Sequence, residues 1–255
     1  MSGRSAIVVP CYNESLRLDP EMLQQLSAVG NCDVVAVDDG STDTTAALLG
    51  AVAAADQRVH VLTLARNQGK GEAVRQGLLW AADQGYNIVG FCDADFATPV
   101  ADVSRLIGLC AAGCDVVLGS RVALLGHDVQ RSPIRHYAGR VFATATSLVL
   151  GFQVYDTQCG AKVFRCGPEL RSALTDRFVS RWAFDVELLG RLEQEYSGTD
   201  SFLEEPLQHW HDVAGSKVST SSSLRAAADL WRIRKALARR RATFSGRDGA
   251  PIDVR

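Results

Sequence analysis

The sequence predicts an α/β fold in which a mostly parallel, Rossmann-like sheet carries helices on both faces. Two observations lead to this prediction. Short apolar runs alternate with longer segments of helical pattern through the first half of the 255-residue chain. Most of these runs end in polar or acidic residues, at the position where ligands bind in an open parallel sheet. A hydrophobic fraction of 47% and a charged fraction of 22% are ordinary for a soluble globular protein of one large or two small domains.

Strands and helices are predicted in alternation along the first half of the chain. Runs rich in Val, Ile and Leu predict strands at 6–10, 33–37, 59–64, 88–92 and 115–118. Apolar residues at helical spacing predict helices between them, at 19–29, 44–55, 72–84 and 102–112. Gly40 permits a tight turn before the second helix, and Ser41 or Thr42 is expected to cap that helix.

The second half has a less regular pattern. Gly126 and Pro133 interrupt any periodicity in 122–135, so we expect a mobile loop there. Helices are predicted at 137–150 and from the 181–189 segment to about 195. We divide the chain into a main domain at 1–218, a linker with a basic amphipathic helix at 219–244, and a disordered tail at 245–255. That basic helix, centred on 224–241, either lies on an anionic membrane surface or docks on the main domain.

Composition and motif spacing exclude several classes of function. The formal net charge of −2 argues against a general nucleic-acid-binding protein. The first turn lacks the Gly-X-Gly-X-X-Gly of dinucleotide-binding proteins, and Gly69-Lys70 is not followed by Ser or Thr as a P-loop requires. The seven cysteines show no paired metal-ligand spacing, and their odd number suits reduced thiols. We recognise no signal peptide and no bilayer-spanning run, and therefore expect a cytoplasmic protein, either free or peripheral at the inner face of a membrane.

Two carboxylates, Asp93 and Asp95, follow the fourth predicted strand. Such hard oxygen ligands suit Mg²⁺ or Mn²⁺ carrying the phosphates of a substrate, although an Asp-X-Asp sequence is equally compatible with an ordinary turn. Because parallel strand ends share one rim, Glu14, Asp38 and Asp39 are expected to converge with this pair. A divalent ion would make such an acidic rim attractive to a pyrophosphate.

Three segments, 9–14, 37–43 and 93–95, together resemble the amino-terminal half of family 2 glycosyltransferases, which are inverting enzymes with the GT-A fold. The resemblance implies that the first two segments hold the base and ribose of a nucleotide. It also implies that the Asp-X-Asp segment holds a metal ion, through Asp95 and Asp93, and a pyrophosphate. The residues expected to bind the nucleotide sugar are Pro10, Tyr12, Glu14, Asp38, Asp39, Lys70, Asp93, Ala94, Asp95, Trp182 and Lys217.

The second half narrows the resemblance. Residues 155–165, 181–189, 208–211 and 215–218 resemble the dolichyl-phosphate β-glucosyltransferase branch, which transfers glucose from UDP-glucose to a polyprenyl phosphate. Members of that branch usually carry membrane anchors that this sequence does not show, so we expect either peripheral membrane binding or an acceptor that is not a long lipid. Two alternatives stay open: a glycosyltransferase for a soluble acceptor such as a natural product, and a catalytically silent nucleotide-sugar-binding protein.

The chemistry of the acceptor decides which residues matter in this half. A hydroxyl acceptor needs a general base, whereas a phosphate is already an anion and needs cations to hold it. Arg121, Arg131 and Arg135 are the candidate phosphate ligands, unless they belong to a solvated basic loop. The resemblance places Asp156 near the transferred sugar, either as a base or as a group that orients a sugar hydroxyl.

Four further residues are candidates for the site, and three of them also have a structural interpretation. Asp185 is either a second catalytic carboxylate or the cap of the helix that follows it. Trp182 either stacks on the sugar or fills the core. His211 is a candidate third metal ligand, although a lone histidine is more often structural. Lys217 is a candidate phosphate contact.

Overall fold

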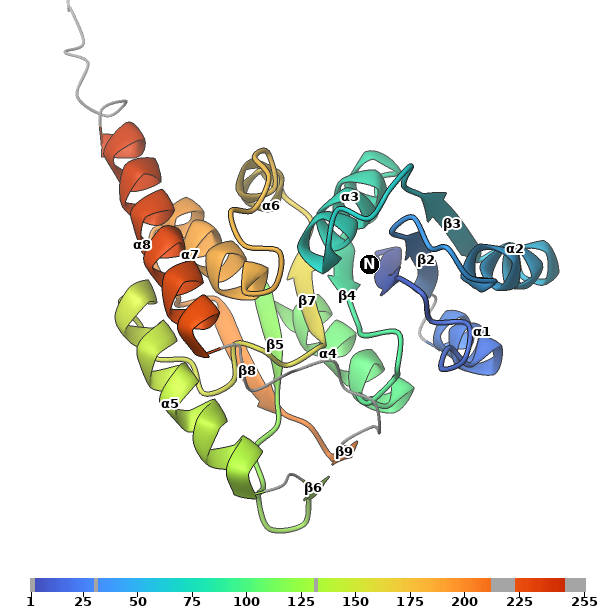
Figure 1. The fold of residues 1–255 in the computed structure, drawn as a ribbon, viewed down its shortest axis with the longest axis horizontal. Helices are drawn as coiled ribbons and strands as arrows, with labels where there is room; N and C mark the ends of the chain where they lie inside the picture. The colour runs from blue at the N-terminus through green and yellow to red at the C-terminus, as the bar shows by residue number, and fades with distance from the viewer. Residues whose placement is uncertain (1–2, 30–31, 131–132, 212–222, 246–255) are drawn as a thin grey trace, which may run out of the picture.

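The computed structural model describes residues 3–29, 32–130, 133–211 and 223–245; it does not describe the side chains of 133–136, 138, 223–225 and 244–245. Its centre is a seven-stranded sheet in the order β3-β2-β1-β4-β7-β5-β8 (Figure 1). The strands of this sheet are β1 (Ser5–Cys11), β2 (Cys32–Asp38), β3 (Val59–Thr63), β4 (Ile88–Phe91), β5 (Val116–Ser120), β7 (Lys162–Arg165) and β8 (Phe202–Pro206). All neighbours pair in parallel except β7, which is antiparallel to both β4 and β5. The predicted mostly parallel sheet is therefore confirmed.

Helices cover both faces of the sheet, as the alternating pattern predicted. They are α1 (Pro20–Ala28), α2 (Thr45–Ala55), α3 (Lys70–Asp83), α4 (Val100–Ala112), α5 (Pro133–Leu150), α6 (Pro168–Ala173), α7 (Phe184–Tyr196) and α8 (Ser223–Ser245). Alternate residues of β1 serve two separate cores: Ile7 packs toward α1, α2 and α4, whereas Val8 packs toward α3, α6 and α7. The buried strands thus read as continuous apolar runs because both faces are covered.

Several local expectations were wrong. Neither Ser41 nor Thr42 caps α2; the N-cap is Thr44, and the Asp43 carboxylate accepts a hydrogen bond from the Thr45 amide at 3.0 Å. The expected loop at 122–135 contains β6 (Asp128–Gln130), which pairs in parallel with β9 (His209–His211). Helix α5 begins at Pro133 rather than at 137. Proline is suited to this position, because the amide hydrogen that it lacks would have no partner in the first turn of a helix.

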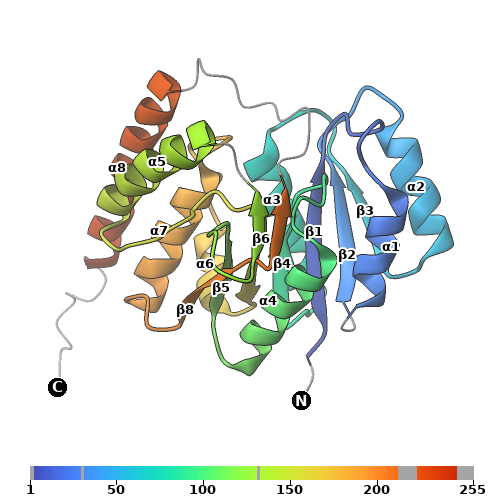
Figure 2. The same cartoon turned by 90° about the horizontal axis from the view of Figure 1, so that it is seen from below.

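The basic helix at the carboxyl end forms as α8 and docks on the main domain. Its Leu230, Ile233 and Leu237 are buried in the same core as α5 and α7, and the three helices lie together at one edge of the molecule (Figures 1 and 2). Gly190 of α7 makes the close approach possible, because a Cβ there would meet the side chains of Leu237 and Leu150. The linker at 219–222 and the tail from 246 lie outside the described residues. Among the described helices, none is long and apolar enough to cross a bilayer.

Candidate active site at the carboxyl ends of the strands

The loops that follow β1 and β2 form one cross-linked wall. The strand ends are neighbours, with Cys11 opposite Asp38 in the register, and they run to the same edge of the sheet (Figure 2). The amide of Asn13 donates to Ser41 Oγ at 3.0 Å, and the amide of Thr42 donates back to Asn13 Oδ1 at 2.8 Å. A third bond runs from the Glu14 amide to the Thr45 hydroxyl at 2.8 Å. The two motifs predicted to hold one nucleotide therefore act as a single rigid surface.

The two aspartates that end β2 are buried and hold backbone. Asp38 Oδ1 accepts a hydrogen bond from the Ser41 amide at 3.0 Å. The two oxygens of Asp39 accept from the amides of Gln68 and Gly69, both at 2.7 Å. Gly40, which follows Asp39, has φ +67°. A Cβ at Gly40 would lie 2.6 Å from the backbone of Arg66, so this turn requires glycine. Asp39 thus fixes the turn before α3 from one side.

Glu14, Pro10 and Tyr12 lie beside this wall at the end of β1. Both oxygens of Glu14 accept from the guanidinium of Arg17, at 2.9 and 2.7 Å. Pro10 and Tyr12 are partly buried at the same strand end. These positions agree with a shared surface, whereas their contacts to a nucleotide stay a prediction.

Asp93, Asp95 and Lys70 form the charged centre of the rim. Lys70 begins α3, directly after the turn that Asp39 holds, and its Nζ lies 2.5 Å from Asp93 Oδ1. Desolvation alone would lower the pKa of Lys70, but the carboxylates of Asp93 and Asp185 outweigh it, so the pKa is raised. Asp95 accepts one bond from the Ala97 amide at 3.1 Å, and burial together with the charge of Asp93 raises its pKa.

Glycine lets the Asp-X-Asp segment pack closely against the second half of the chain. A Cβ at Gly160 would lie 2.5 Å from Cγ of Asp93, so only glycine leaves room for this carboxylate. Ala94, between the two aspartates, is buried. The segment is therefore held by its surroundings and is more than a surface turn.

The two candidate catalytic carboxylates of the second half are each paired with a cation, the partly buried Arg121 or the fully buried Lys162. Asp156 receives a fork from Arg121, with Nε to Oδ2 at 2.6 Å and Nη2 to Oδ1 at 2.8 Å, and the Arg121 amide adds a third bond at 3.1 Å. This pairing outweighs burial and raises the pKa of Arg121. Asp185 accepts from Lys162 Nζ at 2.7 Å, and Lys162 is fully buried. Burial raises the pKa of Asp185, and the charges of Lys162 and Lys70 oppose that shift.

The donor set fits a divalent cation in its chemistry. Asp93 and Asp95 are hard oxygen ligands; burial and then the charge of Asp93 raise the pKa of Asp95, and a divalent ion would relieve the repulsion between the two carboxylates. Over the described ranges, no three His, Cys, Asp or Glu side chains gather closely enough to hold a metal ion. His211 instead lies 3.3 Å from Asp128 and is 54% exposed, so the structure does not bring it to the pair. Phosphate oxygens and water would have to complete the coordination.

Several predicted residues cannot be placed in the site. Arg131 and Lys217 lie outside the described residues, and so does the side chain of Arg135. Trp182 is 42% exposed and meets Phe142 edge-on, with ring centroids 5.5 Å apart, so it neither fills the core nor is held flat by protein. The cap assigned to Asp185 is not formed by its side chain, because Lys162 occupies it and α7 has no side-chain hydrogen bond at its N-cap.

Sequence reasoning missed two residues of this region. Lys162 was passed over although a lysine between Ala161 and Val163 in an apolar run is a signal for a buried, paired cation. Ser180 was passed over as well; its hydroxyl accepts from the amides of Trp182 and Ala183 at 3.3 and 2.9 Å. No sequence signal marked Ser180, because its partners are set by the fold of the turn.

Known proteins match the chain in both sequence and fold. The model of the family "Glycosyl transferase family 2" matches residues 6–170. The chain is 33% identical over 251 residues to the dolichyl-phosphate beta-glucosyltransferase of Dictyostelium discoideum, covering 90% of this chain and 73% of that protein. It is 28% identical over 243 residues to the polyprenol monophosphomannose synthase of Mycolicibacterium smegmatis, covering 93% and 90%.

Among solved structures, one similar fold is that of glucosyl-3-phosphoglycerate synthase from Mycobacterium tuberculosis in complex with Mn²⁺, UDP-glucose and phosphoglyceric acid. The TM-score is 0.65 at 19% identity, over 91% of this chain and 80% of that one. This likeness confirms the predicted GT-A type of sheet, and the sequence matches give the family. The chain therefore belongs to glycosyl transferase family 2 and is a glycosyltransferase.

Proposed function

We propose that this glycosyltransferase moves a sugar, glucose in the favoured case, from a UDP-sugar to a polyprenyl phosphate such as dolichyl phosphate, with inversion. The observation that carries the proposal is the pairing of both candidate bases with cations. Both oxygens of Asp156 accept from the Arg121 fork, which disfavours transfer of a proton to Asp156 from a hydroxyl acceptor, and Asp185 is paired with the buried Lys162. A phosphate acceptor needs no such base. The relatives named for dolichyl phosphate and polyprenol support the same acceptor class.

The binding site for the nucleotide-sugar donor would be formed by residues at the carboxyl ends of the parallel strands. The wall of the first two loops is proposed to hold uracil and ribose, through Tyr12, Glu14 and the loops that Asp38 and Asp39 fix. Asp93 and Asp95 would hold Mg²⁺ or Mn²⁺. When bound, that ion would stabilise the charge that develops on the departing diphosphate. Lys70 supplies a further cation beside the two carboxylates.

The acceptor half would use the second part of the chain. Asp156 would fix one edge of the Arg121 guanidinium and so orient this cation toward an acceptor phosphate. Arg131, Arg135 and Lys217 are proposed as further phosphate contacts, on the sequence argument alone. Trp182 is proposed to stack on the sugar, since its ring is partly exposed near the start of α7.

Peripheral contact with a membrane, at its cytoplasmic face, is part of the proposal. On the outer face of α5, Tyr137, Val141 and Leu148 are 71%, 74% and 79% exposed. On the adjacent α8, Trp231 is 63% exposed, and Lys235 lies over its ring at 5.1 Å. Exposed apolar and aromatic side chains beside basic ones are typical of helices that lie at an anionic bilayer surface.

A screen of nucleotide sugars against three acceptors tests the function. UDP-glucose and GDP-mannose are each incubated with a short polyprenyl phosphate, a soluble phosphorylated acid such as phosphoglyceric acid, and a simple hydroxyl acceptor, with mass detection of product. We expect product from UDP-glucose and polyprenyl phosphate only, and none after addition of a chelator. Product with a soluble acceptor but not with the lipid phosphate would contradict the lipid acceptor. No turnover with any pair, despite nucleotide binding, would favour a catalytically silent protein.

A further inference from the structure

The turn at 180–183, which leads into α7, is tied to the carboxyl-terminal helix by one buried hydroxyl. Ser180 is 2% exposed, and its Oγ donates to Asp229 Oδ2 of α8 at 2.9 Å. The same oxygen accepts from the amides of Trp182 and Ala183. A hydroxyl has one proton, and giving it to a carboxylate forms a charge-assisted bond that fixes its lone pairs toward the two amides. Ser180 therefore links Asp229 to the backbone of the turn.

This turn packs directly on the segment that carries Lys70. The carbonyl of Arg181 accepts from the Gly71 amide at 3.4 Å, and the Arg181 guanidinium donates to Asn67 Oδ1. Gly69 has φ +100°, and a Cβ there would lie 2.5 Å from Arg181 Nε. Phe184, the first residue of α7, lies equally close to Gly71, where a Cβ would be 2.8 Å from its own Cβ. Residues 67–71 thus have the 180–184 segment as one wall.

The opposite wall of residues 67–71 is Asp39, which accepts from the amides of Gln68 and Gly69. Lys70 projects from between the two walls to Asp93 at 2.5 Å. A shift of either wall therefore moves the ammonium group relative to the Asp-X-Asp pair. A misplacement of about 1 Å in a positioning group can cost roughly a hundredfold in rate.

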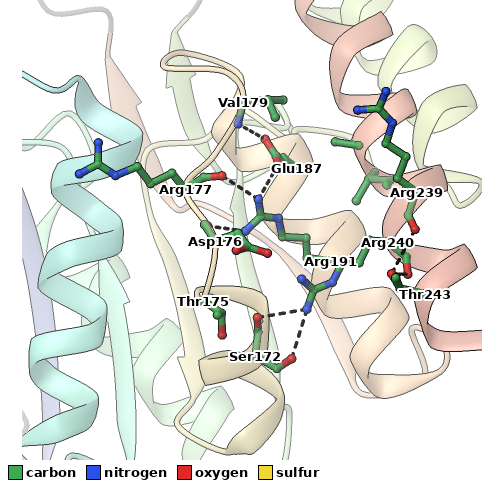
Figure 3. A pocket seen from close by; sticks show the side chains of 12 residues that line it. Ser172, Thr175, Asp176, Arg177, Val179, Glu187, Arg191, Arg239, Arg240 and Thr243 are labelled. Atoms are coloured by element: carbon green, nitrogen blue, oxygen red, sulfur yellow. Dashed lines mark hydrogen bonds and ion pairs between the residues drawn. The ribbon is translucent and has the colours of Figure 1, made fainter. Parts of the chain in front are cut away.

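The chain before the turn is held to α7 by hydrogen bonds that do not involve Asp229. Arg191 of α7 donates to the carbonyl of Ala173. It also donates to the carbonyls of Asp176 and Arg177, and Glu187 accepts from the Val179 amide (Figure 3). Arg191 and Glu187 of α7, together with residues of 172–179 and of α8, line a cavity of about 620 Å³. None of the lining residues belongs to the ends of the strands. After Val179, the next polar anchor along the chain is Ser180 with Asp229.

We propose that Asp229 is a positioning residue for the donor site, acting through Ser180 and the Arg181–Trp182 turn on Lys70. The helix that carries Asp229 is then part of the architecture of the active site. This inference rests on the proposed function only in naming the donor as a nucleotide sugar. The placement of the turn against residues 67–71 stands without it.

The test compares Asp229→Ala with two variants that isolate the link. Asp229→Asn keeps an oxygen that accepts from Ser180. Arg240→Ala removes another charged anchor of α8, its bonds to Glu195 and Ser172, at a distance from the turn. We measure UDP affinity by calorimetry with Mg²⁺, the KM for donor and for acceptor separately, and hydrogen exchange at the amides of residues 67–71 and 180–183. The exchange measurement needs no ligand and therefore reports on the link even if the proposed acceptor is wrong.

For Asp229→Ala we expect faster exchange in both segments and donor affinity about tenfold weaker, the factor for one lost charge-assisted bond. The acceptor KM should not change, and Asp229→Asn should restore most of the donor affinity. Adding Asp229→Ala to Ser180→Ala should have no further effect, which keeps the test valid if one single variant folds poorly. Equal donor defects in Asp229→Ala and Arg240→Ala, or unchanged exchange at 67–71, would overturn the proposal.

Discussion

Replacing Arg121 and Asp156 one at a time distinguishes a holding role for Asp156 from a role as catalytic base. The pair has the geometry of a two-bond fork, at 2.6 and 2.8 Å, and Asp156 is 7% exposed. Removing one partner of a buried pair costs about 3–5 kcal/mol, because the other charge stays buried without its counterion. The cost of Arg121→Ala should lie at the lower end of this range, because two backbone amides still donate to Asp156. They are the amides of residue 121, at 3.1 Å, and of Gln158, at 3.3 Å.

Lysine at position 121 keeps the charge but cannot reproduce the fork. Arg121→Lys should therefore cost roughly the 1.5–3 kcal/mol of one charge-assisted bond, and Asp156→Asn a similar amount. Denaturant unfolding gives these differences in the free energy of unfolding. If Asp156 only holds Arg121, both variants should lower the rate with polyprenyl phosphate by comparable factors, and the acid limb of the pH–rate profile should not move.

A different outcome would refute this reasoning. If Asp156→Asn abolished turnover and removed the acid limb while Arg121→Lys remained near normal, Asp156 would be the base. The acceptor would then be a hydroxyl compound. Stability alone cannot give that pattern, because both variants weaken the same contact.

Three further predictions concern the metal site and the surface. Metal binding requires ionised Asp95, so Mn²⁺ affinity measured by calorimetry should fall as pH drops through the raised pKa, beginning above the value of about 4 for an ordinary aspartate; a flat profile from about pH 7 to 4 would contradict it. Gly160→Ala should displace the Asp93 carboxylate and abolish metal-dependent transfer, as Asp95→Asn should, while circular dichroism shows a folded protein; normal Mn²⁺ affinity in this variant would count against the packing argument. Leu148→Ser with Lys235→Glu should weaken co-sedimentation with anionic vesicles and leave turnover of a water-soluble acceptor analogue unchanged; equal sedimentation would exclude this face.

The sequence predicted the elements whose pattern is long and regular. Strands β1 to β5 and the placement of Asp93 and Asp95 after β4 followed from apolar runs and the rule that parallel strand ends share a rim. Strand β7 was missed because its four residues begin with the buried Lys162 and end with Arg165, which breaks the apolar pattern. The helical spacing of Leu230, Ile233 and Leu237 predicted α8 but not its neighbour, because a buried stripe fits a lipid surface as well as a protein core.

Pairings between distant residues could not be read from the sequence. Arg121 and Asp156 were each selected as site residues, for separate roles, and the structure joins them across 35 positions. Asp39 was expected to face a nucleotide, and its two oxygens hold the amides before Lys70. Hydrogen-bond geometry of this kind arises only when the loops are assembled on the sheet, so local pattern carries no information about it.

Because β7 comes late in the sequence, the edge of the sheet at β4 has no partner until most of the chain has been synthesised. Phe91 of β4 pairs with Lys162 of β7, so the edge of the first four-stranded unit stays open while all of the intervening chain is made by the ribosome. Gly90 has no side chain that would obstruct the pairing of β7 with β4. A Cβ at Gly90 would lie 2.5 Å from the Lys162 carbonyl oxygen. A nascent chain that ends before β7 would present an apolar open edge to chaperones and to other chains. Truncations that keep only the donor half should therefore aggregate, and the nucleotide wall should not be obtainable as an independent domain.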